Sequence, residues 1–174
     1  MSEYTEVKEK AVKLMNLIVD ADTRLVRFAS LLALHDSLNR HGFRLIQKQS
    51  YGPAGGYQIF YASGRLLVRI KTRGDEKGPR ANQPHLSVSL YDGRALDWQN
   101  DQAKINARGR VEPKAMTTAE RFQPIDFQGN PQRFVLILGG QYDGAGADPW
   151  ANRTHFQFPP AFDFNGADQL LVQP

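Results

Sequence analysis

The first forty residues place apolar side chains at helical spacing. Apolar residues recur every three or four positions in two runs, as they do along the buried face of an α-helix. Asp22 suits the N-cap of the second run, and Gly42 suits the end of it. The pattern predicts two helices, over about residues 3–20 and 23–40.

After Gly42 the apolar period changes to two, which is typical of β-strands. Ser63-Gly64 separates two of the alternating segments and suits a two-residue hairpin turn. The fully apolar "FVLIL", starting at Phe134, is typical of a central strand. Five or six strands are therefore predicted, carried by the segments "FRLIQKQ", "YQIFYA", "RLLVRIKT", "HLSVSLY" and "RFVLILGG".

The stretch between Tyr91 and Pro131 has little periodicity and is rich in charged and turn residues. It predicts a long irregular insertion, and such loops in compact domains are usually functional or mobile. A chain of 174 residues suits one domain. We predict a single α+β domain over 1–174, in which a helical segment (1–42) packs on a twisted antiparallel sheet formed by a β-rich segment (43–174).

Positive charge is concentrated in one place. The formal net charge is +4, and the segment 65–80 alone carries six basic and two acidic side chains. A local excess of this kind suits capture of a polyanion, although solubility alone would also explain it. The absence of cysteine excludes disulfides, thiolate zinc sites and a cysteine nucleophile.

No targeting or membrane-spanning segment is expected. No apolar run reaches the roughly 20 residues that a membrane-spanning helix needs. The N-terminal "MSEYTEVKEK" is too charged for a signal peptide.

Strand alternation predicts which charged side chains share a face. In "RLLVRIKT", Arg69 and Lys71 point away from the apolar side chains, and in "PHLSVSLY" His85 and Ser87 do the same. The segment "THFQF" repeats the pattern at His155. If the three strands share a sheet, these polar side chains lie together on its open face.

That set of residue types suits metal-free RNA cleavage by the 2′-hydroxyl group. A base removes the hydroxyl proton, an acid protonates the leaving 5′ oxygen, and cations stabilise the charge on phosphorus. Histidine suits both proton transfers, since its unperturbed pKa is about 6.5. The candidate catalytic residues are His85, Lys71, Arg73, Ser87 and His155. The candidate substrate-binding residues are Arg69, Lys77, Arg80 and, for stacking on a base, Tyr142 and Trp150.

A purely structural interpretation stays open for these residues. A histidine at the start of a strand is more often structural than catalytic. The polar face of an antiparallel sheet is often only its solvated side.

The order of elements, with helices first and then strands that carry "RIKTRGD", "GPR" and "PHLSVS", resembles the nuclease toxin domains of the barnase–EndoU–colicin–RelE group. The resemblance covers about residues 43–160 and departs from the group in the insertion after Tyr91. It implies a metal-independent, cofactor-free ribonuclease. By position, His85 would be the general acid or base, Lys71 and Arg73 would contact phosphate, and Ser87 would be an auxiliary hydrogen-bonding group.

The resemblance also implies a biological setting. The substrate would be tRNA or another cellular RNA, and the partner would be a cognate immunity protein. The domain would be delivered as part of a larger bacterial toxin and would act in the cytoplasm of a target cell.

Two other functions are compatible with the sequence. An ADP-ribosyltransferase toxin would use a catalytic glutamate late in the chain, and no glutamate follows Glu120. A non-enzymatic binding module would use the basic face to hold an acidic or phosphate-bearing partner. Degradation of bulk RNA in EDTA would distinguish a ribonuclease from both.

Overall fold

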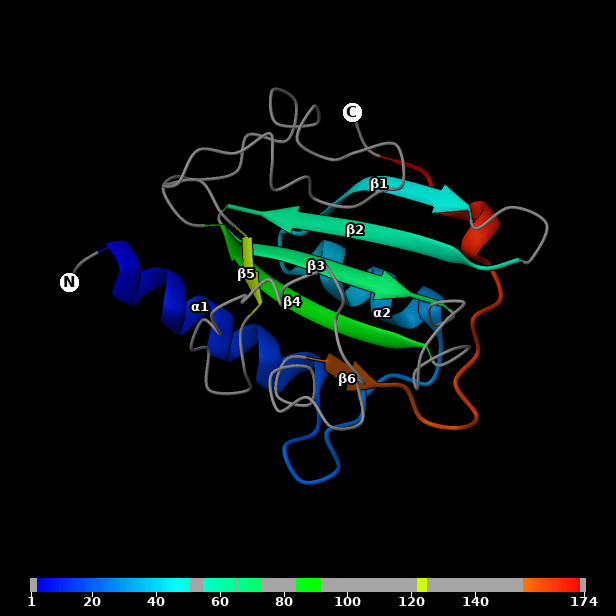
Figure 1. Ribbon diagram of the computed structural model, residues 1–174, viewed down its shortest axis with the longest axis horizontal. Helices are drawn as coiled ribbons and strands as arrows, with labels where there is room; N and C mark the ends of the chain where they lie inside the picture. Colours follow the sequence, from blue (N-terminus) through cyan, green and yellow to red (C-terminus); the bar gives the residue numbers. More distant parts are fainter. Residues whose placement is uncertain are drawn as a thin grey trace, which may run out of the picture.

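Two helices pack on one face of an antiparallel sheet (Figure 1), which confirms the predicted α+β class. The computed structural model describes residues 3–50, 55–64, 66–72, 84–91, 122–124 and 155–172. The helices are α1 (Glu3–Ile18) and α2 (Leu31–Arg40). Within the described part of the chain, neither is long and apolar enough to cross a membrane.

The described strands follow the order β1-β2-β3-β4-β5, with β6 also paired to β4. Every neighbouring pair is antiparallel. The short strands β5 and β6 pair with opposite ends of β4 and so lie one after the other along it (Figure 1). The strands are β1 (Arg44–Ser50), β2 (Tyr57–Ser63), β3 (Leu66–Lys71), β4 (His85–Tyr91), β5 (Phe122–Pro124) and β6 (His155–Gln157).

The second helix begins eight residues later than the sequence pattern predicts. Its N-cap is Ser30, whose hydroxyl oxygen accepts a hydrogen bond from the Ala33 N–H at 3.2 Å, so the assignment to Asp22 is wrong. Residues 19–30 form an ordered loop instead, because the Asp20 carboxylate accepts the backbone N–H groups of Asp22 and Thr23. Short acidic side chains compete with the helix for backbone groups in this way.

The predicted ends of the other elements are close to those observed. Gly42, with φ of +83°, follows the last residue of α2 and its cap, as expected for a residue that ends a helix. Ser63 pairs with Leu66, so the hairpin turn begins at Gly64, one residue later than predicted. Gly64 has a φ of +57°, which two-residue hairpin turns favour. The predicted strand "FVLIL" lies outside the described residues, as does the insertion apart from β5.

The hydrophobic core lies between the helices and the sheet. Its strand residues alternate along β1 to β4, as period-two patterning predicts, and include Ile70, Leu86 and Val88. Phe156 of β6 belongs to the same core. The opposite face of the sheet also carries buried apolar side chains, among them Phe60 and Leu67. The central strands are therefore buried on both sides.

The C-terminal segment closes the core at the end of β1. The Lys48 ammonium donates to the carbonyl oxygens of Ala167 and Leu170 at 2.9 and 2.8 Å. These carbonyls belong to the short 3₁₀ helix η4 (Ala167–Gln169) and the residue after it. The Tyr57 hydroxyl donates to the carboxylate of Asp168 in the same turn. The last described residues are thus fixed to the sheet by side chains of β1 and β2.

One polar network crosses the helix–sheet interface. Tyr61 of β2 is fully buried, and its hydroxyl lies 2.6 Å from Nδ1 of His35 on α2. The Asn39 amide donates to the other ring nitrogen at 2.9 Å. Burial lowers the pKa of His35 below its ordinary value of 6.5, although the nearby Asp36 carboxylate acts in the opposite direction.

The His35 network predicts a loss of stability in mild acid. The unfolded chain binds a proton at His35 at a higher pH than the folded protein does, so the free energy of unfolding rises with pH through this range. The contribution is complete above pH 6.5 and is lost as the pH falls toward the lower folded value. Urea titrations between pH 5 and 8 should show a smaller dependence on pH for His35→Gln than for wild type. The exposed His41→Gln is the control, and equal dependence in wild type and His35→Gln would contradict the prediction.

Candidate active site

Two rows of side chains cross the sheet on the face away from the helices. In the first row, Gln58, Lys71, His85 and Gln157 are successive cross-strand neighbours on β2, β3, β4 and β6. In the second row the neighbours are Phe60, Arg69, Ser87 and His155. Side chains that face each other across strands lie about 5 Å apart and interact directly. Apart from Phe60, the two rows are entirely polar or charged.

The two histidines of these rows come together although 69 residues separate them in sequence. Ser87 pairs with His155 and His85 with Gln157, so the histidines occupy diagonal positions on β4 and β6. Their ring centroids are 5.0 Å apart, with the ring planes inclined at 59°. The pairing of β4 with β6 thus creates a histidine pair on one face of the sheet.

Arg69 lies beside the histidine pair. Its terminal amino group is 3.5 Å from Nε2 of His155. Between them, on β4, is Ser87, whose small side chain leaves room for the guanidinium to extend over the middle strand. With arginine as the donor, Nε2 of His155 is the acceptor, and a neutral imidazole then carries its proton on Nδ1. Such a nitrogen can accept a proton from a substrate.

The polar side chains around the histidine pair form one cluster, which consists of Arg69, Lys71, His85, Ser87 and His155. This polar cluster is not the open face that the sequence pattern predicts. His85 and Lys71 are each 4% exposed, and Ser87 is 2% exposed. The prediction is wrong because β2 and β3 are apolar in both phases, as strands are when both faces of a sheet are covered. Arg69 and His155 are half-buried and form the accessible side of the cluster.

Five of the sequence-based candidates lie outside the described residues, and their predicted roles stay predictions. They are Arg73, Lys77, Arg80, Tyr142 and Trp150. The structure therefore brings together four of the five proposed catalytic residues, together with Arg69.

The structure adds Gln58 to the candidate residues. It is buried and lies next to Lys71 in the first row. The sequence "YQIFYA" already contained a signal for this residue, because strand alternation places the Gln58 side chain on the same face as Lys71. It was missed because the rest of that segment is apolar and carries no charge.

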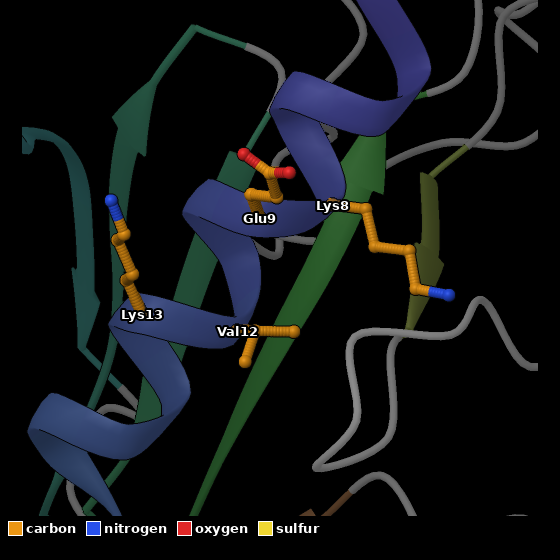
Figure 2. A pocket seen from close by; sticks show the side chains of 4 residues that line it. All are labelled: Lys8, Glu9, Val12 and Lys13. Atoms are coloured by element: carbon orange, nitrogen blue, oxygen red, sulfur yellow. The ribbon is translucent and has the colours of Figure 1, made fainter. Parts of the chain in front are cut away.

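A surface hollow on α1 is separate from this cluster. Its described lining residues are Lys8, Glu9, Val12 and Lys13 (Figure 2). In Figure 2 the two lysine side chains extend to opposite sides of the helix, so they do not converge on one point.

Comparison of the chain with protein-family models, curated proteins and solved structures found no match. Among the residues that the structure describes, no group of three or more histidine, aspartate or glutamate side chains is arranged to bind a metal ion. The resemblance to nuclease toxins therefore stays a prediction.

Because Ser87 is small, a small and a large replacement at this position should have different effects on the contact between Arg69 and His155. Ser87→Ala should keep the approach of Arg69 to His155. Ser87→Leu should block it and destabilise the fold by about 1–3 kcal/mol, because the site is already tightly packed. Urea denaturation and the imidazole NMR signals of His155 measure the two effects. Unchanged His155 signals in a folded Ser87→Leu variant would show that the contact does not depend on a small residue at this position.

Proposed function

We propose that this protein is a metal-independent ribonuclease that cleaves RNA by attack of the 2′-hydroxyl group on the adjacent phosphate. The observation that carries the proposal is the histidine pair, with ring centroids 5.0 Å apart and Arg69 beside one ring. Two proton-transfer groups and a fixed cation are what this reaction needs.

The positions of the residues suggest a role for each. The 2′-hydroxyl proton goes to Nε2 of His155, which is already an acceptor toward Arg69. The oxygen attacks phosphorus, and the bond to the 5′ oxygen breaks with a proton supplied by His85. The products are a 2′,3′-cyclic phosphate end and a free 5′-hydroxyl end. Arg69 and Lys71 stabilise the negative charge on the phosphoryl oxygens.

Burial decides from which side a substrate enters. His85 and Lys71 expose very little surface, whereas His155 and Arg69 are half-buried. RNA would therefore approach along β6, the strand that carries His155. The substrate would replace the contact between Arg69 and His155, so that Arg69 contacts the phosphate and His155 accepts the hydroxyl proton.

The resemblance to toxin nucleases extends the proposal to the cell. Transfer RNA is one candidate substrate, and a cognate immunity protein is the candidate partner. Action in the cytoplasm of a target cell, after delivery as part of a larger toxin, belongs to the same proposal.

A binding module is the second candidate, and the burial of His85 and Lys71 favours it. Buried polar clusters often fix a structure without taking part in chemistry. In that case Arg69 and His155 would form part of a surface that holds a phosphate-bearing partner without turnover. No observation on the described residues favours ADP-ribosyl transfer.

The proposal predicts that each histidine is needed for cleavage of total tRNA in excess EDTA. Replacing a proton-transfer group should lower the rate by about 10²–10⁴-fold. The variants are His155→Ala and His85→Gln. Glutamine is chosen at position 85 because His85 is buried, and alanine would leave a larger cavity there. Exposed His41→Ala is the matched control and should cleave like wild type. Thermal melts confirm that each variant is folded.

The outcomes separate the candidates. An inactive wild type would overturn the ribonuclease and leave the binding module. An active wild type whose two histidine variants cleave equally well would show that the activity resides elsewhere.

Arg69 should contribute to the salt dependence of RNA binding. Each phosphate contact to single-stranded RNA contributes roughly 0.7 to the slope of log affinity against log salt, because bound counterions are released. Arg69→Ala should therefore flatten the slope by roughly 0.7, measured by fluorescence anisotropy with a 2′-O-methyl oligonucleotide that cannot be cleaved. Arg27→Ala, on the loop between the helices, should leave it unchanged. Equal slopes for wild type and Arg69→Ala would show that Arg69 does not contact an RNA phosphate.

A further inference from the structure

The strand that carries His155 depends on contacts on both of its edges. β6 has only three residues, all of which pair with β4. On its other edge, the Val26 N–H donates to the carbonyl oxygen of Gln157 at 2.9 Å, and Leu25 forms a parallel bridge with the same residue. Figure 1 shows β6 between β4 and the loop that joins the helices. Residues 19–30 are therefore the outer support of the candidate catalytic strand.

Arg24 makes a side-chain contact from this loop to β6. Its guanidinium carbon lies 4.8 Å from the centre of the Phe156 ring, within the range of a cation–π interaction. Phe156 is fully buried in the core and is the direct sequence neighbour of His155. Because side chains alternate along a strand, fixing the Phe156 ring on one face fixes the direction of His155 on the other.

The backbone of Arg24 is in an uncommon conformation. Its φ of +59° makes it the only non-glycine residue with positive φ among those described. This conformation costs about 1–3 kcal/mol for a non-glycine residue and persists only when its surroundings fix it. Those surroundings include two backbone hydrogen bonds, from Arg24 N–H to Asp20 O at 2.8 Å and from Asp20 N–H to Leu25 O at 2.9 Å.

We infer that Arg24 is a positioning residue that sets the distance and orientation of His155 relative to His85. The inference rests on the proposed ribonuclease function. Arg24 does not touch the histidine pair: it acts through the Phe156 ring and the short strand. A misplacement of about 1 Å at a reacting group can cost about 10²-fold in rate, so a contact that holds a three-residue strand in place bears directly on turnover.

Glycine and asparagine at position 24 separate this role from backbone effects. Both residues tolerate positive φ, so Arg24→Gly and Arg24→Asn remove the guanidinium without adding strain. Arg24→Lys keeps a cation that can lie over the Phe156 ring. The matched control is Arg27→Gln, which removes the same charge from an arginine of the same loop. The Arg27 guanidinium donates to Asn16 O and Val19 O and forms an exposed ion pair with Asp20 at 3.6 Å, and none of these partners is in β6.

The experiment measures RNA cleavage and the histidine signals of the full chain together. For Arg24→Gly and Arg24→Asn we expect kcat to fall on the order of 10- to 100-fold with KM little changed, because substrate-binding groups remain. The imidazole NMR signals of His155 and His85 should shift, while those of His35 stay in place. Arg24→Lys should recover part of the rate, and Arg27→Gln should match wild type in both measurements.

Each result has a defined meaning. Unchanged kcat and unchanged His155 signals in folded Arg24→Gly or Arg24→Asn would overturn the inference. If wild type does not cleave RNA, the proposed function fails, and the NMR comparison still decides whether Arg24 positions His155. Equal loss in Arg24→Gly and Arg27→Gln would assign the effect to loop charge and also overturn the inference.

Discussion

The pairing of β6 with the edge of β4 is the constraint on which the candidate site depends. It brings His155 next to Ser87 and, diagonally, next to His85. A shift of one residue in this register would turn His155 toward the helices and Phe156 toward the polar rows. The register is fixed because Phe156 fills the core and pairs with Leu86 there. Core packing on one face therefore holds the polar geometry on the other.

The central strands are buried on both faces, so most of the polar side chains in the two rows are removed from water. Removing an ammonium or imidazole from water is costly unless hydrogen bonds or opposite charges compensate. Lys71 and His85 lie almost wholly inside the protein, where each has interaction partners. Buried groups with such partners are held in place, which suits the proposed role of orienting a phosphate. The half-buried Arg69 and His155 connect these residues to the surface.

The loop between the helices meets the C-terminal part of the described chain around β6. Backbone hydrogen bonds join Asp163 to Ala29 and Leu31 at 2.9 and 2.8 Å, and a third joins Gln157 to Val26. These contacts close loops of more than 100 residues, and the entropic cost of closing a loop grows only slowly with its length. The site is complete only when the loop after α1 and the segment that starts at β6 are both in place. Arg24 lies at that junction.

The sequence alone determined the class of fold and the phase of most side chains. Helical spacing gave α1, period two gave the first four strands, and alternation placed Leu86 inside and His85 on the other face, because these signals are local. Only the tertiary structure decided where α2 begins. The Asp20 carboxylate accepts the N–H groups of Asp22 and Thr23, which the helical spacing had placed at the start of the second helix. The tertiary structure also decided that Lys71, His85 and Ser87 are buried, because period-two alternation places a side chain on one face of a sheet without showing whether that face is covered. The 5.0 Å approach of His85 and His155, which 69 residues separate in sequence, depends on the register between β4 and β6, and no periodicity within either segment contains that information.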